Sequence, residues 1–247
     1  MDRMLYVGMS GAKQAMEQQA STANNMANAS TPGFRAQINA FRAVPVTGQE
    51  VGTRAFVVAT TPSADFKQGP LRETGNPLDI AIQGDGWLAV TGADGQEAYT
   101  RAGNLKVGSD GQLLAMGNHA VIGDSGPIVV PPGQALGIGS DGMVSARNVG
   151  DPNAVTTDVG RLKLVNPDAA DLVRGDDGLF RMREGLQAAQ VDRTRTVTSG
   201  VVEQSNVNPV ESMVAMIANA RSFELQMKSI QTANENAQSA NKLLAYG

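Results

Sequence analysis

The residue types that carry out covalent catalysis are scarce in this sequence. Its 247 residues contain one histidine, His119, and no cysteine. A His–Cys pair is therefore impossible, and a serine nucleophile would have to use that single histidine, which lies in the turn-rich segment Gly117–His119. A lone histidine in a loop is more often structural or solvated than catalytic, and no Gly-x-Ser-x-Gly motif is present. We therefore predict no nucleophilic active site and no thiolate metal site.

Carboxylates next to glycines are the remaining candidates for chemistry. Gly175–Gly178 reads Gly-Asp-Asp-Gly, and Gly139–Gly142 places one aspartate in a similar setting. Calcium loops need oxygen ligands at positions 1, 3, 5, 7, 9 and 12, and neither segment has that spacing. Turn carboxylates are the better interpretation, and the adhesive tripeptide Arg174–Asp176 is short enough to arise by chance. We predict no metal, no cofactor and no catalytic residue, although two carboxylates distant in sequence could still meet in space, as a carbohydrate-active enzyme requires.

Composition and charge narrow the class of protein further. The chain has 28 glycines, only 4% aromatic residues and a formal net charge of -4. Abundant glycine with few aromatics favours short strands and tight turns, and the lack of a basic stripe argues against nucleic-acid binding. The first residues lack the apolar run of a cleaved signal peptide. The longest apolar stretch near the C-terminus, Met213–Ala218, is too short to span a bilayer, so we expect no membrane insertion.

A helix is predicted at the N-terminus, within residues 1–30. The region up to Asn28 has no proline and few β-branched residues, and its apolar side chains recur at helical spacing. They are Leu5, Met9, Ala12 and Met16, followed by Ala20, Ala23, Met26 and Ala27. Pro32 and Gly33 should end the helix, because proline keeps the preceding residue out of the α region and glycine admits a positive φ.

A second, longer helix is predicted at the C-terminus, within residues 198–247 and starting near residue 208. Asn208 is a suitable N-cap, Pro209 occupies the first helical position, and Glu211 stands where a capping box needs its acid. A repeat of three and four residues follows, which is coiled-coil spacing. It comprises Met213, Met216, Ala220, Phe223, Met227, Ile230, Asn234, Ala237, Asn241 and Leu244.

The two apolar stripes are narrow, so neither helix should be stable alone. The helices could pair with each other as an intramolecular antiparallel hairpin, and they could also pack against other chains. We favour the second interpretation, because faces of small and amide side chains suit close helix contacts. The predicted subunit interface comprises Leu5, Met9, Ala12, Met16, Ala23 and Met26 of the first helix, and Met213, Met216, Ala220, Phe223, Met227, Ile230 and Leu244 of the second.

Between the helices, the pattern changes to that of a β-rich domain. Asp-Gly pairs, a strong hairpin signal, recur between apolar runs, with their aspartates at positions 85, 94, 110, 141 and 177. We predict the α+β class: long N- and C-terminal helices forming a coiled-coil-like stalk, with an inserted antiparallel, barrel-like middle domain. The expected boundaries are 31–70 for an extended connector and 71–197 for the β-rich domain. Candidate strands are Leu78–Ile82, Trp87–Val90, Ala98–Arg101, Leu105–Val107, Gln112–Ala115, Ile128–Val130, Ala135–Ile138, Met143–Ala146, Arg161–Val165 and Leu179–Met182.

Three segments, in this order, resemble the rod and hook family of bacterial flagellar axial proteins. Residues 23–35 read Ala-Asn-Asn-Met-Ala-Asn-Ala-Ser-Thr-Pro-Gly-Phe-Arg and carry the family motif residues Asn24, Asn25, Asn28, Pro32, Gly33 and Phe34. Met26 stands where the family usually has leucine, a change of similar volume. The second segment combines Gly-Asp-Gly-Trp-Leu at residues 84–88 with Tyr-Thr-Arg-Ala-Gly-Asn at 99–104. The third, residues 199–208, resembles the approach to the family's C-terminal helix.

The resemblance spans nearly the whole chain and implies a structural subunit of the flagellar basal-body rod rather than an enzyme. Segments 35–46 and 174–180 are most similar to the proximal rod proteins, with a distal rod or hook subunit as the alternative. The family implies polymerisation through the terminal helices into the helical drive shaft that crosses the periplasm. Its partners would be copies of this chain and other rod subunits.

The resemblance also implies export by the flagellar type III apparatus, which uses no cleaved signal peptide. The absence of cysteine and of an apolar leader agrees with that route. The alternative from another class is a monomeric β-domain binding module or carbohydrate-active enzyme with helical appendages. Such a protein would keep its function after both ends were deleted.

Overall fold

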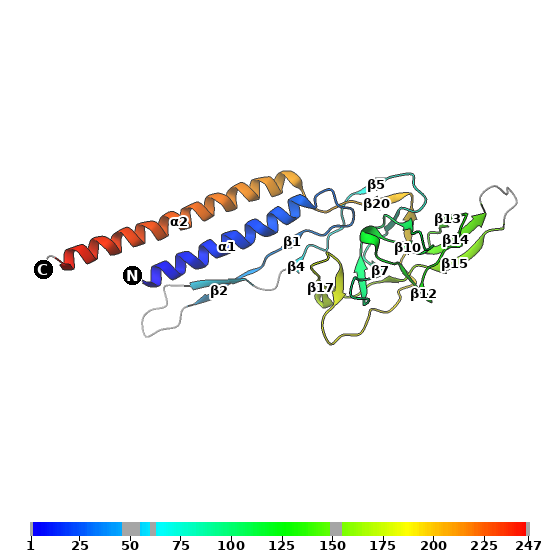
Figure 1. Ribbon diagram of the computed structural model, residues 1–247, viewed down its shortest axis with the longest axis horizontal. Coiled ribbons are helices and arrows are strands. Elements are labelled where there is room, and N and C mark those ends of the chain that lie inside the picture. The colour runs from blue at the N-terminus through cyan, green and yellow to red at the C-terminus, as the bar shows by residue number, and fades with distance from the viewer. Residues whose placement is uncertain (1, 46–54, 60–62, 149–154, 246–247) are drawn as a thin grey trace. The chain divides into compact units, whose positions relative to one another are not determined.

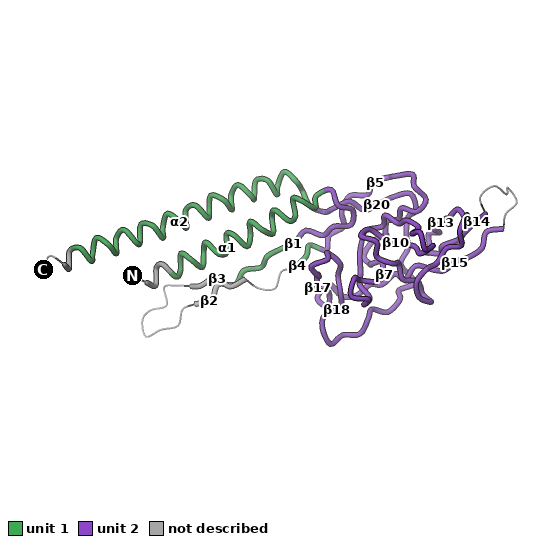
Figure 2. Tube along the Cα trace, in the orientation of Figure 1, with its two compact units in different colours: residues 1–29, 37–65, 207–247 green, residues 30–36, 66–206 purple. Residues whose placement is uncertain are grey.

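The structure, a computed structural model, describes residues 2–45, 55–59, 63–148 and 155–245, with side chains for 6–41, 63–148 and 155–242. The chain forms two compact units (Figure 2). Unit 1 comprises residues 1–29, 37–65 and 207–247, and unit 2 comprises residues 30–36 and 66–206. The residues predicted as a connector, 31–70, are thus divided between the two units.

Unit 1 contains two long antiparallel helices (Figure 1), α1 (Asp2–Ala27) and α2 (Pro209–Ala245). The predicted cap of α2 is confirmed. The side-chain oxygen of Asn208 accepts hydrogen bonds from the backbone N–H groups of Val210 at 3.1 Å and Glu211 at 3.4 Å, which satisfies donors that the first helical turn leaves unpaired. Among the described helices, neither is long and apolar enough to cross a membrane.

Two short antiparallel strand pairs complete unit 1. β1 (Gln37–Ile38) pairs with β4 (Ser63–Ala64), and β2 (Phe41–Pro45) pairs with β3 (Ala55–Ala59). These strands bring the chain back along α1 after the helix has ended.

The side chain of Asn25 fixes β1 to α1. Its carboxamide oxygen accepts a hydrogen bond from the Gln37 N–H at 2.7 Å, and its nitrogen donates to the Gln37 carbonyl at 2.9 Å. Asn39 adds a further bond from its side chain to the Glu17 carbonyl at 3.2 Å. A side-chain amide in the last turn of a helix can thus replace a strand partner, because it offers N–H donors and a carbonyl acceptor together.

Unit 2 consists of short antiparallel strands grouped in several sheets. They are β5 (Leu71–Glu73), β6 (Ile80–Ile82), β7 (Trp87–Thr91), β8 (Glu97–Thr100), β9 (Lys106–Val107), β10 (Leu113–Leu114), β11 (Ile122–Gly123), β12 (Gly126–Pro127), β13 (Gln134–Ile138), β14 (Met143–Asn148), β15 (Thr157–Arg161), β16 (Leu164–Val165), β17 (Leu172–Arg174), β18 (Phe180–Met182), β19 (Val197–Ser199) and β20 (Val201–Glu203). The largest sheet has the order β16-β7-β8-β18-β17, and a second has the order β13-β14-β15. Two-stranded sheets pair β10 with β9, β11 with β12, β19 with β6, and β20 with β5.

The core of unit 2 lies between these sheets and is aliphatic. Leu88 and Val90 of β7 pack with residues from distant parts of the chain, including Leu113, Val144 and Leu162. An aromatic cluster adjoins it, in which the ring of Trp87 lies 4.7 Å from Phe180 and 5.9 Å from Phe66 between centroids. Burying this apolar surface supplies most of the free energy that favours folding.

Four of the five Asp-Gly pairs make the predicted hairpin turns. Their glycines, Gly95, Gly111, Gly142 and Gly178, have φ between 75° and 80° and connect β7–β8, β9–β10, β13–β14 and β17–β18. Each aspartate accepts a hydrogen bond from the backbone N–H two residues later, as Asp94 does from Gln96 at 3.0 Å. The fifth pair, Asp85-Gly86, connects β6 and β7, which lie in different sheets. The carboxylates that could suggest calcium therefore serve turns.

Two features of the predicted β domain need correction. The described strands form separate sheets of two to five strands, without a closed barrel. Ile128–Val130, predicted as a strand, contributes only an isolated bridge between Val129 and Gln112. Strands β5, β11, β12, β15, β17, β19 and β20 lie wholly or mainly outside the predicted set, and the predicted strand Arg161–Val165 is divided between the end of β15 and β16. Sheet closure and the pairing of edge strands depend on contacts between residues that are distant in sequence. The alternation of apolar and polar residues within one strand does not encode those contacts.

Candidate assembly surface and a buried ionic junction

One row of residues on each helix makes the intramolecular pair. On α2 a row of half-buried positions recurs every four and three residues: Ser212, Met216, Asn219, Phe223, Gln226, Ile230, Ala233, Ala237 and Ala240, with Ala215 half-buried beside it. Gly8 of α1 faces Ile230, and Gly11 faces Gln226. A Cβ at these glycines would lie 2.8 and 2.9 Å from the facing side chains. The helices therefore approach closely where α1 has no side chain.

The predicted interface residues divide into two groups. Met216, Phe223 and Ile230 of α2, and Ala12 and Met26 of α1, are buried or half-buried within unit 1. The others with described side chains are exposed: Met9, Met16, Ala23, Met213, Ala220 and Met227. The side chains of Leu5 and Leu244 lie outside the described residues.

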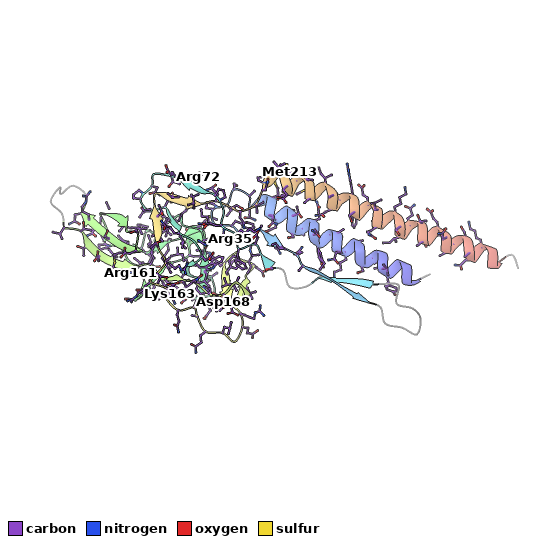
Figure 3. The ribbon with its side chains drawn as sticks, turned by 180° about the vertical axis from the view of Figure 1, so that it is seen from behind. Arg35, Arg72, Arg161, Lys163, Asp168 and Met213 are labelled. Atoms are coloured by element: carbon purple, nitrogen blue, oxygen red, sulfur yellow. The ribbon has the colours of Figure 1, made fainter. Side chains whose placement is uncertain are left out.

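The exposed group belongs to a second row on each helix, which we call the exposed row. On α1 it comprises Tyr6, Met9, Lys13, Met16, Ala20, Ala23 and Ala27, and on α2 it comprises Val210, Met213, Ile217, Ala220, Glu224, Met227, Gln231 and Asn234. Met16 is 61% exposed and Met213 is 51% exposed, and Figure 3 labels Met213 near the start of α2. Large apolar side chains left in contiguous exposure mark a surface for another macromolecule.

A buried ionic junction, which the sequence did not predict, lies in unit 2. Glu203 at the end of β20 is 0% exposed, and the side chains of Arg35 and Arg101 beside it are also buried. One Glu203 oxygen accepts hydrogen bonds from the Arg35 guanidinium and from the Gly69 N–H, the latter at 2.9 Å. Its other oxygen lies 3.3 Å from Nη1 of Arg101. One carboxylate thus contacts two guanidinium groups (Arg35 is labelled in Figure 3).

The charges of this junction do not balance, because two guanidinium groups share one carboxylate. Burial lowers the pKa of Arg101 to about 10, and the attraction of Glu203 opposes that shift. Arg101 also donates to the carbonyl groups of Ile82 at 3.2 Å and Gly84 at 2.5 Å. Its guanidinium carbon lies 5.8 Å from the centre of the Trp87 ring, a favourable cation–π contact. These contacts orient Arg101 toward Glu203.

Backbone contacts around Glu203 join three stretches of the chain. The Gly33 N–H donates to the Glu203 carbonyl at 2.8 Å, and the Gln204 N–H donates to the Pro70 carbonyl at 2.9 Å. The Asn206 side chain accepts from the Ala36 N–H at 2.7 Å and donates to the Lys67 carbonyl at 3.0 Å. The junction therefore ties the residues that follow α1 to those that precede α2.

The motif residues around Gly33 explain this close approach. Gly33 has a φ of 69°, and a Cβ there would lie 2.3 Å from the backbone of Arg101 and Ala102. Phe34 is buried, and the guanidinium carbon of Arg174 lies 4.3 Å from the centre of its ring. Arg174 also donates to the Arg35 carbonyl at 3.0 Å, so the Arg-Gly-Asp tripeptide is not presented as a free adhesive loop.

The remaining motif residues have local roles. Asn28 donates from its side chain to the Asn24 carbonyl at 2.9 Å, near the end of α1, and Pro32 follows that end. His119 contacts the Thr91 carbonyl through Nδ1 at 3.1 Å, and no group of three His, Cys, Asp or Glu side chains among the described residues is arranged to bind a metal. The histidine therefore has a structural contact.

Comparison with known families gives three separate matches. Residues 5–35 match "Flagella basal body rod protein", residues 81–146 match "Flagellar hook protein FlgE/F/G D1 domain", and residues 198–243 match "Flagellar basal body rod FlgEFG protein C-terminal". Arg35, Arg101 and Glu203 each lie in a different one of these three segments. The ionic junction is thus the place where all three meet.

Individual relatives match over nearly their full length. The flagellar basal-body rod protein FlgF of Salmonella typhimurium is 53% identical over 250 residues, and that of Escherichia coli is 52% identical over the same length. Each comparison covers 99% of this chain and 99% of the relative. The flagellar basal-body rod protein FlgG of Buchnera aphidicola is 31% identical, covering 89% of this chain and 91% of its own.

Proposed function

The chain belongs to the flagellar basal-body rod protein family, and we propose that within the rod it is the proximal subunit, corresponding to FlgF. The observation that carries the proposal is the near full-length identity of 53% and 52% with the FlgF proteins of Salmonella typhimurium and Escherichia coli, compared with 31% for the FlgG protein of Buchnera aphidicola. A distal rod subunit, the alternative raised by the sequence, is less well supported for that reason.

Like its relatives, the chain is a structural protein and not an enzyme. The titratable groups that drew attention in the sequence have structural roles. Asp177 accepts hydrogen bonds from Arg181, which lower the pKa of its carboxyl group. His119 contacts a backbone carbonyl. Asp94 and Asp177 are distant in sequence but bind the same guanidinium group, that of Arg181, so both carboxylates are held in ion pairs.

We propose that the rod forms through the exposed rows of α1 and α2. Those rows carry large apolar side chains that the intramolecular pairing leaves in water, and burying them against neighbouring subunits is favourable. A contact between two different surfaces of the same protein repeats without closing and generates a helical array. The coiled-coil-like packing expected from the sequence would then involve the helices of several chains.

Polar residues in the intramolecular row limit its strength. Ser212, Asn219 and Gln226 alternate there with Met216 and Phe223, so part of the surface between the two helices is polar. We therefore expect the pair to open readily in the free subunit and to gain order on assembly. Amide exchange on the soluble monomer tests this: residues 2–28 and 209–245 should exchange rapidly, and slow exchange across both helices would refute order on assembly.

The proposal includes a location and a route. The chain would lie in the periplasm-spanning rod of the basal body, in contact with other rod subunits and with copies of itself. It would be exported by the flagellar type III apparatus without a cleaved signal peptide. A subunit whose helices are only marginally stable before assembly suits a route that passes unfolded chains.

Complementation of a strain lacking the gene tests the function. Full-length protein should restore rods and motility and should copurify with basal bodies. Variants lacking residues 2–28 or 209–247 should fail to enter the rod, because each lacks one of the two exposed rows. A monomeric β-domain binding module would keep its function after both deletions. Normal function of the doubly truncated chain would therefore contradict the proposal.

A further inference from the structure

We propose that the exposed row of α1 packs antiparallel against the exposed row of α2 in a second copy of this chain, with Lys13 facing Glu224. The proposal rests on the rod function above and identifies the contact through which copies associate. Both rows lie outside the intramolecular pairing, and both advance by alternate steps of three and four residues. This spacing keeps each row on one side of its helix over several turns, as pairing with another helix requires.

In this register, large side chains of one row face small side chains of the other. Two helices interdigitate well when bulky and small residues alternate across the contact, because neither voids nor clashes result. The facing pairs are Met16 with Ala220, Ala20 with Ile217, Ala23 with Met213, and Ala27 with Val210. The C-terminal half of α1, which is rich in alanine, therefore matches the N-terminal half of α2, which carries the larger residues.

The charges favour the same register. Lys13 is the only charged residue in the exposed row of α1, and Glu224 is the only one in that of α2. Lys13 has a 3.7 Å contact with Glu17 that is exposed to solvent, and Glu224 makes no ion pair among the described residues. Sliding the helices by one turn would place Lys13 opposite Ala220 or Met227, and desolvating the two charges would then bring no compensating attraction.

The surface of α2 is hollowed where the largest residues of α1 would lie. A groove of about 720 Å³ is lined mainly by apolar surface, from Phe223, Glu224, Met227, Lys228, Ile230, Gln231 and Asn234. In the proposed register, Tyr6 and Met9 of the second copy lie opposite this groove. A parallel arrangement with the same ion pair would instead place Ala20 and Ala23 there, and it would leave Val210 and Met213 uncovered.

We assign the helix that packs on the exposed row of α2 to a second copy of this chain, because α1 and α2 already pair in this register within one chain. Within one chain, Gly11 of α1 faces Gln226 of α2. Lys13 lies two residues after Gly11, and Glu224 lies two residues before Gln226, so they occupy matching positions in this antiparallel register. The α1 of a second copy would thus lie along α2 in the orientation and register of the chain's own α1. Each copy carries both rows, so the contact repeats from copy to copy.

Disulfide trapping tests this register directly, since the chain has no cysteine of its own. Ala23→Cys and Met213→Cys are placed in two differently tagged copies, expressed together, and basal bodies are oxidised with diamide. A disulfide between the two tagged copies is expected. The matched off-register pair is Ala23→Cys with Asn234→Cys, which should yield at least about tenfold less crosslink. Thr22→Cys with Asn219→Cys in one copy is the internal control, because these side chains lie 3.2 Å apart within a chain.

A charge exchange provides the second arm. Lys13→Glu alone and Glu224→Lys alone should each reduce incorporation about two- to fivefold, the range for a modest ion pair, and the double exchange should recover it. Equal crosslinking of the off-register pair, or no recovery in the double variant, would overturn the proposed register. If the chain is present in rods without the crosslink between positions 23 and 213, the register fails while the rod function stands. If the unsubstituted chain is absent from rods, the rod function itself fails.

Discussion

Replacing Glu203 by glutamine tests the buried ionic junction without changing the size of the side chain. The substitution removes the one carboxylate that contacts both Arg35 and Arg101, so two like charges remain buried without it. Removing one partner of a buried ion pair costs about 3–5 kcal/mol. Because domains are stable by only about 5–15 kcal/mol, we expect Glu203→Gln to destabilise unit 2 severely.

Tryptophan fluorescence during urea unfolding measures this effect. Trp87 is the only tryptophan in the chain, it is buried in unit 2, and it contacts Arg101. Its signal therefore follows the unit that contains the junction. The free energy of unfolding should fall by about 3–5 kcal/mol, and the melting temperature by roughly 2–4 °C for each kcal/mol. The matched control is Asp141→Asn, which breaks the exposed ion pair with Arg161 and should cost at most about 1 kcal/mol.

A second substitution separates charge from packing. In the Glu203→Gln background, Arg35→Met removes one of the two uncompensated cations, so the double variant should be more stable than the sum of single effects predicts. Additive effects would show that the buried charges do not interact. A loss below about 1 kcal/mol for Glu203→Gln, comparable to the surface control, would refute the reasoning about the junction.

Three further predictions concern assembly, backbone geometry and pH. Met213→Asp should leave the unfolding free energy within about 0.5 kcal/mol of the parent but should reduce the amount of chain in isolated rods. Ser229→Asp is the control, because Ser229 is exposed but does not belong to the exposed row. It should leave both quantities unchanged. Gly33→Ala should destabilise unit 2 by more than about 1 kcal/mol in urea unfolding, because alanine disfavours a φ of 69° and its Cβ has no room. Hydrogen bonds from Arg195 and Thr194 lower the pKa of Asp192 from 3.8 to about 2. The unfolded chain then binds more protons between those values, so the melting temperature should hold above pH 4 and fall as the pH drops toward 2; Asp192→Asn should reduce this dependence.

Local signals in the sequence predicted local structure well. Asn208, Pro209 and Glu211 mark the start of α2 through groups that act within one turn of the chain. The Asp-Gly turns were predictable for the same reason, since the aspartate and the glycine satisfy the turn without help from elsewhere. Asp85-Gly86 is the exception, because the strands on either side of it pair with distant segments.

The helical stripes were predicted only in part, because each contains two overlapping rows. Met216 and Phe223 belong to the intramolecular row, whereas Met213 and Ala220 belong to the exposed row. A count of apolar residues merges the two, since Asn219 and Gln226 take part in the intramolecular row without being apolar. Hydrophobic spacing alone therefore identified the helices correctly but did not separate their two faces.

The ionic junction could not be predicted from patterns within short windows. Arg35 and Glu203 are 168 positions apart, and no local rule pairs two charges over that distance. A usable signal was nevertheless present. Arg35, Arg101 and Glu203 each lie in one of the three segments that resemble the flagellar family. Charged residues inside such segments were the ones to examine as a candidate buried cluster.

Electron microscopy of isolated basal bodies tests the central claim most directly. The map should contain this chain in the proximal part of the rod, with α1 and α2 ordered and their exposed rows buried against the helices of neighbouring subunits. A map in which the chain is absent from the rod, or in which Met16 and Met213 face solvent in the assembled structure, would contradict the account.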